Sequence, residues 1–202
     1  MECTDASRGP DGQWRERQFA DAQALAHVGS WERRLPDDRA VWSDELCRIF
    51  GQPVGFSPRL EEFALLLHPE DRDRVLSDLG RAALGEMCES SFRIVRPSGE
   101  IRHVHGRAGG RADASGGVAC VLGTMQDVTE RREAEIARRE AQNLFETAFS
   151  QAPIGMALIT PDGHWLKVNR ALCLITGWPE SELIQRPFRE ITHPTTSPST
   201  RS

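Results

Sequence analysis

One motif occurs twice in this sequence. Residues 43–51 (SDELCRIFG) align with residues 169–177 (NRALCLITG), and the two segments share Leu, Cys, Ile and Gly at matching positions. Each copy begins with a residue that favours a helix N-cap and ends at a glycine suited to a helix C-terminus. A repeat of this length indicates two copies of one domain, not a solenoid. Other landmarks recur in the same order at nearly the same spacing: Gly29 and Gly155, the turns at residues 36–38 and 161–163, and the His-Pro pairs at residues 68–69 and 193–194.

The composition is that of a globular protein with one or two domains. The chain has 202 residues, of which 39% are hydrophobic and 27% are charged, and domains commonly comprise roughly 100–200 residues. The formal net charge of −5 argues against the positive field that nucleic acid requires, so no nucleic-acid partner is expected. The sequence contains neither a signal peptide nor an apolar run that could span a bilayer, and a cytoplasmic location without a membrane segment is expected. The five cysteines are widely spaced, which predicts reduced thiols and no zinc site.

Local patterns in the first copy predict an α+β domain with an antiparallel sheet and helices on one face. Two short strands flank a Pro-Asp-Asp turn, as in a hairpin. A helical middle follows, in which Val75, Leu76 and Leu79 are expected to form one buried stripe, and three more strands close the domain. The predicted elements are strands at residues 31–35 and 40–42, helices at 43–50, 60–67 and 69–84, and strands at 91–96, 101–107 and 118–125.

The segment after Asp127 predicts a linker helix. Small and apolar residues recur there at spacings of three and four, which is a heptad seam of the kind found in coiled coils. Asp127 and Glu130 have the spacing of a capping box, which would start the helix. Two arrangements are open: a parallel homodimer through residues 130–149, or a solvated linker helix that packs on its own domain. The seam comprises Ala134, Ala137, Ala141, Leu144 and Ala148.

These motifs together resemble the PAS sensory family, in the variant often repeated ahead of bacterial signalling enzymes. The matching segments of the first copy fall in family order: VGSWE (28–32), WSDEL (42–46), IFG (49–51), HPEDR (68–72), FRIVR (92–96), GEIR (99–102) and GTMQDVTER (123–131). The second copy resembles the front half of a PAS domain through APIG (152–155), DG (162–163), VN (168–169), LITG (174–177) and ITHP (191–194).

The resemblance implies the following organisation. We expect a disordered segment at residues 1–19, a PAS domain with its PAC motif at 20–127, an amphipathic linker (signalling) helix at 128–149, a partial, truncated second PAS domain at 150–195 and a disordered tail at 196–202. The fold expected for the complete domain is a five-stranded antiparallel sheet with helices on one face. The partial domain would not fold autonomously, because it lacks three of the five strands.

The resemblance also implies a sensory function. In this reading, a small-molecule ligand or partner shifts the sheet, and Asp127, Thr129 and Glu130 transmit the shift to the linker helix. The chain would be a cytoplasmic sensory and dimerisation module of bacterial signal transduction, and it contains no catalytic constellation. The alternative is an N-terminal fragment of a sensor histidine kinase or of a cyclic-di-GMP synthase or hydrolase. The residues expected to line a pocket are Trp42, Phe50, Phe63, Leu67, Leu76, Phe92, His103 and His105.

The motifs of haem and flavin relatives are absent, so the ligand stays open. Flavin photoreceptors of the family carry a reactive cysteine in an Asn-Cys-Arg-Phe motif, whereas Cys47 and Cys173 are expected to be small core residues. Haem relatives use a histidine on the long helix, where this chain has none, and His68 is expected to cap the turn before it. His103 and His105 share one strand face and could line the pocket, lie at the surface or bind a metal, but no third ligand can be placed from sequence, so no metal is predicted.

Overall fold

The computed structural model describes residues 10–112 and 116–186. The chain divides into two compact units, Met1–Glu133 and Ala134–Ser202, which are considered separately below. No helix in the described ranges is both long and apolar enough to cross a membrane.

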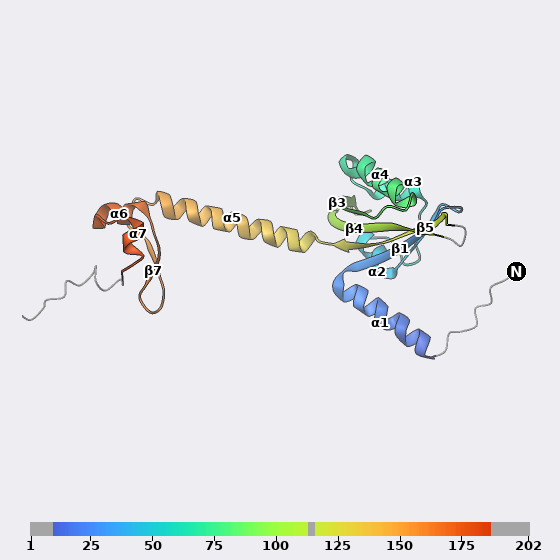
Figure 1. Ribbon diagram of the computed structural model, residues 1–202, viewed down its shortest axis with the longest axis horizontal. Helices are drawn as coiled ribbons and strands as arrows, with labels where there is room; N and C mark the ends of the chain where they lie inside the picture. The colour runs from blue at the N-terminus through green and yellow to red at the C-terminus, as the bar shows by residue number, and fades with distance from the viewer. Residues whose placement is uncertain (1–9, 113–115, 187–202) are drawn as a thin grey trace, which may run out of the picture. The chain divides into compact units, whose positions relative to one another are not determined.

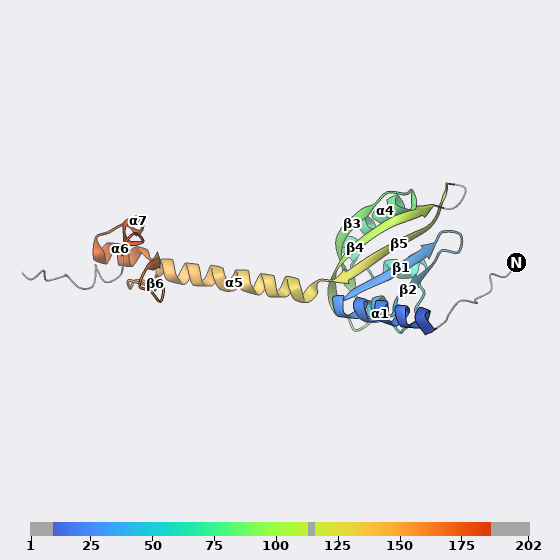
Figure 2. The same ribbon diagram turned by 60° about the horizontal axis from the view of Figure 1, so that its bottom comes forward.

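A five-stranded antiparallel sheet forms the centre of the first unit (Figure 2). The spatial order of its strands is β2-β1-β5-β4-β3, so the N-terminal hairpin pairs with the last strand of the unit. The mixed architecture and the five-stranded antiparallel sheet predicted from sequence are confirmed. The strands are β1 (Val28–Arg34), β2 (Arg39–Trp42), β3 (Cys88–Val95), β4 (Ile101–Ala112) and β5 (Val118–Asp127).

Short helices cover one face of this sheet and enclose the core (Figure 1). The Ser43 hydroxyl caps the first of them by accepting the N–H of Leu46, and Gly51 ends it with a left-handed backbone at φ 66°. Both features agree with the repeat motif, in which a polar N-cap and a terminal glycine bracket an apolar helix. The helices are α2 (Asp44–Phe50), α3 (Leu60–Leu66), the 3-10 turn η1 (Pro69–Asp71) and α4 (Arg72–Ala83).

The buried stripe of α4 differs from the one predicted. Val75, Leu79 and Ala82 are buried, whereas Leu76 is only half-buried. Residues at i, i+4 and i+7 lie along one line of a helix, while a residue at i+1 is rotated by about 100°. Leu76 therefore lies at the side of the helix.

A helix, α1 (Pro10–Ala26), precedes the sheet, so the expected disorder of residues 1–19 is corrected for residues 10–19. The remainder of that segment lies outside the described residues. The helix contains many Ala, Gln, Glu and Arg residues, which favour helical structure. Its buried Gln23 donates to the Ser30 hydroxyl at 2.9 Å, which ties α1 to β1.

The second unit repeats the start of the first. It contains most of α5 (Thr129–Gln151), then β6 (Ala157–Ile159), β7 (Trp165–Val168), α6 (Arg170–Thr176) and α7 (Glu180–Leu183). Its small core comprises Trp165, Val168 and Leu183. The expected tail at residues 196–202 lies outside the described part of the chain.

The N-cap residue makes the same pair of hydrogen bonds to the preceding strand segment in both copies. In the first, the Ser43 hydroxyl accepts the N–H of Ser30, and Ser43 N–H donates to the Ser30 carbonyl. In the second, Asn169 Oδ1 accepts the N–H of Met156, and Asn169 N–H donates to the Met156 carbonyl. The structural repeat thus has the register that the sequence motif predicts.

Candidate functional site

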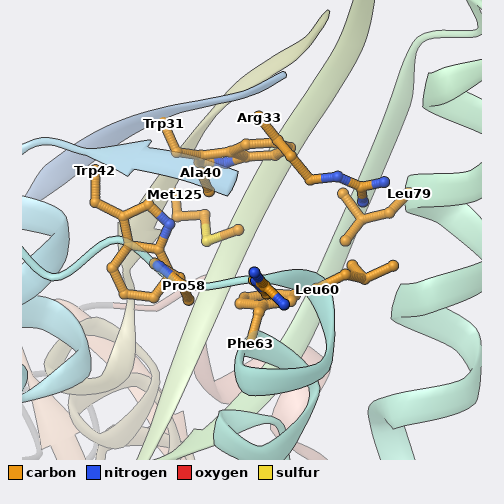
Figure 3. Close-up of a pocket in the computed structure, with 10 residues that line it drawn as sticks. Trp31, Arg33, Ala40, Trp42, Pro58, Leu60, Phe63, Leu79 and Met125 are labelled. Atoms are coloured by element: carbon orange, nitrogen blue, oxygen red, sulfur yellow. The ribbon is translucent and has the colours of Figure 1, made fainter. Parts of the chain in front are cut away.

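Two small cavities lie between the sheet and the helices of the first unit. Each has a volume of about 20 Å³, close to the room that one water molecule requires. Trp31, Leu79 and Met125 line both cavities, so their side chains separate them. Figure 3 shows these three side chains around the same space as Trp42 and Phe63. A movement of the three separating side chains would join the cavities into one larger pocket.

The indole ring of Trp31 is the bulkiest part of this partition. It is 7% exposed and lies against Gly123 of β5, its partner in the strand register. A Cβ atom at position 123 would lie 2.9 Å from Cζ2 of the ring, so glycine there leaves room for the indole. The indole Nε1 is buried and has no hydrogen-bond partner among the described residues. It is therefore a donor that a bound molecule could satisfy.

An aromatic cluster closes the first cavity from the helix side. The ring of Trp42 lies 4.6 Å from that of Phe50, 5.4 Å from that of Phe56 and 6.3 Å from that of Phe63, measured between centroids. The last two contacts are edge-to-face, an arrangement that aromatic quadrupoles favour. Because Phe50 belongs to α2, this cluster couples the cavity wall to that helix.

The predicted pocket residues separate into three groups. Trp42 and Phe63 line the first cavity, and Phe92 lines the second. Phe50 and Leu67 are buried in the surrounding core. The remaining three, Leu76, His103 and His105, lie elsewhere.

Sequence reasoning missed the side chains that separate the cavities. Met125, Gly123 and Val121 alternate along β5, and the period of two could have placed them on the inner face. Leu79 was assigned to the buried stripe, but the residues that border a void depend on how neighbouring elements pack. Trp31 lies in the VGSWE segment, and nothing in that segment indicates that its ring borders a cavity.

His103 and His105 lie on the face of the sheet opposite the cavities. Their neighbour Val104 is fully buried, and successive strand residues point to opposite faces. The imidazole of His105 lies 3.0 Å from Ser91 Oγ through Nδ1 and 2.9 Å from Glu89 Oε1 through Nε2. The expectation that these histidines line the pocket is therefore corrected. Within the described ranges, no group of three or more His, Cys, Asp or Glu residues could hold a metal ion.

The residues present do not form a site for haem or flavin in this conformation. Sites for groups of that size occupy roughly 300 Å³ or more, far above the volume of either cavity. Cys47 is fully buried in the core of the first unit, and Cys173 packs half-buried against that of the second. His68 caps η1, as predicted, since its Nδ1 accepts the N–H of Glu70 at 3.3 Å.

The junction between β5 and α5 is held by a compact set of hydrogen bonds. Oδ1 of Asp127 accepts the backbone N–H of Thr129 at 2.9 Å and its hydroxyl at 2.6 Å. The same hydroxyl oxygen accepts the N–H of His103 at 2.8 Å, and Val128 N–H donates to the His103 carbonyl. Thr129 is buried. The first residue of α5 is thereby bonded to both β4 and β5.

The predicted capping box is replaced by this arrangement. Glu130 is exposed, and the N–H of Asp127 donates to the carbonyl of His27 at 3.1 Å. Because α5 begins at Thr129, Asp127 lies one residue too early to be its N-cap. Its carboxylate instead accepts the hydroxyl of Thr129, and the spacing of a capping box does not predict that contact.

Arg96 connects the end of α2 to the same carboxylate. Its Nε donates to the carbonyl of Ile49 at 2.9 Å, and its Nη2 donates to that of Arg48 at 3.3 Å. That Nη2 also lies 3.9 Å from Asp127 Oδ2, and Nη1 bonds Glu100 at 2.8 Å. A guanidinium fork suits such multiple acceptors. A continuous path therefore leads from the aromatic cluster through α2 and Arg96 to the start of α5.

A second charged cluster fixes η1 to the edge strand β3. Asp71 Oδ2 accepts both the backbone N–H and the Nε–H of Arg93, at 2.8 Å and 2.9 Å. The Arg93 guanidinium lowers the pKa of Asp71 to about 2, and the two acids Asp71 and Glu70 raise the pKa of Arg93. This ion pair holds the helical layer at the sheet edge.

Family comparisons match both copies. Models described as PAS fold match residues 39–125 and 143–201. A solved sensory box histidine kinase/response regulator from Burkholderia thailandensis is 23% identical, covers 64% of this chain and 98% of its own, and superposes with a TM-score of 0.50. That structural similarity supports the fold.

Two curated relatives are named as a histidine kinase and as a sensor protein. A blue-light-activated histidine kinase of Brucella ovis is 33% identical over 134 residues, which is 62% of this chain and 26% of the relative. Sensor protein FixL of Bradyrhizobium diazoefficiens is 29% identical over 164 residues, 78% of this chain and 31% of the relative. The chain thus spans between a quarter and a third of the length of these relatives.

Proposed function

Since this chain belongs to the PAS family, we propose that it is a non-catalytic sensory module. It relays to α5 whether a ligand occupies the two cavities that Trp31 lines. The observation that carries the proposal is the path from the cavity wall to Thr129. Phe50 contacts Trp42 at the cavity, and Arg96 bonds the carbonyl groups at the end of the same helix. Asp127 lies beside the Arg96 guanidinium and accepts the hydroxyl of Thr129, the first residue of α5.

The proposed domain organisation assigns a role to each segment. Residues 20–127 sense the signal, residues 128–149 transmit it, and residues 150–195 are the front half of a second PAS domain. Asp127 and Thr129 transmit by holding the start of α5 to β4 and β5. The exposed Glu130 belongs to the same first turn.

The ligand class follows from the cavity lining. The walls are mainly aromatic and aliphatic, and the indole N–H of Trp31 is a buried donor without a partner in the described structure. A small, mainly apolar molecule with one hydrogen-bond acceptor would suit this lining. It would have to displace the flexible side chains of Leu79 and Met125 to join the cavities.

The output is a parallel homodimer through residues 130–149 in the cytoplasm. Ala134, Ala137, Ala141, Leu144 and Ala148 are all exposed along α5, which leaves the predicted seam free for a partner. Movement at the junction would change how two such seams pair.

An alternative context is supported by the curated relatives. One is named as a blue-light-activated histidine kinase and the other as a sensor protein. The same module could therefore serve as the sensor portion of a histidine kinase or of an enzyme that makes or degrades cyclic-di-GMP.

The junction is tested by Thr129→Val, which keeps the shape of the side chain but removes its hydroxyl. We expect the bonded amides of Thr129, Arg132 and Glu133 to exchange with solvent roughly tenfold faster, because the bonds of the Thr129 hydroxyl to Asp127 and to His103 N–H are lost. Thr124→Val is the matched control, since Thr124 is an exposed threonine on β5. Unchanged exchange in Thr129→Val would contradict the relay.

The dimer and the ligand are tested together by native mass spectrometry of the full chain. The expected result is a dimer with a small-molecule adduct that Trp31→Phe weakens. Leu144→Glu should give the monomer, whereas Ile136→Glu, at an exposed position outside the seam, should keep the dimer. A monomeric parent chain would refute dimerisation through α5.

A further inference from the structure

The charged residues in the lining of the first cavity are both arginines. Of the ten described residues that line it, Arg33 and Arg59 carry a charge, and none is acidic. Arg33 follows Trp31 by two residues on β1, so both side chains lie on the inner face of the sheet. Figure 3 shows the Arg33 side chain reaching from β1 towards Leu79, which lines the same cavity. The wall of this mainly apolar cavity therefore has a net positive charge.

The Arg33 guanidinium is largely buried but has open donors. Its side chain is 16% exposed, and its Nε is buried and forms no hydrogen bond among the described residues. Asp38 Oδ1 lies 3.2 Å from that Nε as an ion-pair contact. A guanidinium has five N–H donors, and a buried donor without an acceptor costs free energy. Arg33 can therefore bind another acceptor that enters the cavity.

Arg59 adds a second positive charge at the exposed side of the same cavity. It directly precedes α3 and is exposed. Glu62 Oε2 accepts the backbone N–H of Arg59 at 2.7 Å, and within the described ranges no carboxylate forms an ion pair with the Arg59 side chain. An anionic group at this position would meet two guanidinium groups and one nearby acid, Asp38.

We infer that the first cavity binds a small apolar carboxylic acid in its ionised form, with the carboxylate on Arg33. This inference rests on the proposed function, because it names the ligand class of the same cavities. The planar guanidinium can hold a carboxylate through two parallel N–H···O bonds. The apolar body of the acid packs against Trp42 and Phe63 and displaces Leu79 and Met125.

A carboxylate suits this wall better than a phosphate. A phosphate monoester carries about two negative charges at neutral pH, whereas a carboxylate carries one. Arg33 is the one cation that lies largely inside the wall, since Arg59 is exposed. A second buried negative charge would lack a buried partner, and an unpaired buried charge is costly.

The test compares an acid with its uncharged analogue by isothermal titration of the full chain at neutral pH. We expect phenylacetate to bind at least roughly tenfold more tightly than phenylacetamide, because a hydrogen bond to a charged group is stronger than one to a neutral group. Hexanoate and hexanamide repeat the comparison with an aliphatic body. The preference should be the same for both pairs, since the carboxylate carries it.

Three variants locate the preference. Arg33→Met keeps an unbranched apolar side chain, so it should abolish the preference and leave binding of the two neutral probes unchanged. Arg34→Met is the matched control at the next residue of β1, whose side chain is 65% exposed, and it should keep the preference. Arg59→Gln, at an exposed position that tolerates substitution, should weaken the preference by about threefold, because exposed ion pairs are weak.

The outcomes separate this inference from the proposed relay. Neutral probes that bind as tightly as the acids refute the inference and leave an uncharged ligand for the relay. A preference that survives Arg33→Met, tighter binding of phenyl phosphate than of phenylacetate, or no binding of any probe also refutes it. If the acids bind as expected but do not change hydrogen exchange of the Thr129 amide, the carboxylate site stands and the relay to α5 is refuted.

Discussion

The two copies of the repeated motif have the same local structure but differ in burial. In both, a capping side chain accepts the N–H three residues ahead, and a left-handed glycine ends the helix. In the first copy the helix between them buries Leu46, Cys47, Ile49 and Phe50, whereas α6 of the second contains no buried residue. Capping and turn signals act within a few residues, so they form in both copies.

The difference arises from the rest of the sheet. In the first unit, β5 pairs with β1, and Arg96 at the end of β3 binds the carbonyl groups at the C-terminal end of α2. These partners come from residues far ahead in the sequence. The motif therefore specifies a helix and its register, whereas burial of that helix requires strands that are distant in the sequence.

The largest expected effect comes from shortening the equivalent isoleucines. Ile49→Ala should cost the first unit about 2–4 kcal/mol, because it leaves a cavity in a close-packed core. Ile175→Ala should change stability by less than about 0.5 kcal/mol in the monomer, since that side chain is exposed. Urea unfolding at low protein concentration, followed by hydrogen exchange of each unit, measures both. An equal loss of unfolding free energy in the two variants would contradict the difference in burial between the two copies.

Removing the helix caps should affect both copies by a smaller amount. Ser43→Ala and Asn169→Ala should each cost about 1–2 kcal/mol, because each side chain accepts two backbone N–H groups. Asn169 also donates to the Ile154 carbonyl at 2.8 Å, so its replacement should cost more. Amide exchange of α2 and α6 reports each loss separately, and Asn169→Asp, which keeps an accepting oxygen, should retain part of the stability.

The smallest expected effect concerns the ion pair of the first unit. Asp71→Asn should cost about 1 kcal/mol at neutral pH, since it removes the charge that Arg93 binds. The pKa of Asp71 is lowered from 3.8 to about 2, so its contribution is present above about pH 4 and is lost as the pH falls towards 2. Unfolding of the parent and the variant should therefore differ at pH 7 and converge near pH 2. An unchanged difference at pH 2 would assign the effect to packing.

Much of the fold was predictable because its signals are local. The turn at residues 36–38, the N-cap Ser43 and the alternation along β5 each depend on neighbouring residues. The same holds for His68, whose side chain caps the turn two residues ahead. Local signals gave a wrong prediction at Leu76. This residue is apolar like its buried neighbours on α4, but it lies on a different face of the helix.

The candidate site was less predictable because it depends on contacts across the sheet. Asp127 and Thr129 were expected at the junction, but their bonds to each other, to His103 and to Arg96 needed the strand register. His103 and His105 share a strand face in any register, yet only the sheet pairing decided that this face lies away from the cavities.

By itself, the sequence determined the repeat, the order of helices and strands from β1 to β5 and the presence of a linker helix after them, because periodicity and capping act over a few residues. The tertiary structure decided which apolar side chains border the cavities, and it decided that Ile49 is buried while Ile175 is exposed. These outcomes depend on which distant strand lies beside each element. The sequence around a residue does not show which distant strand that residue packs against.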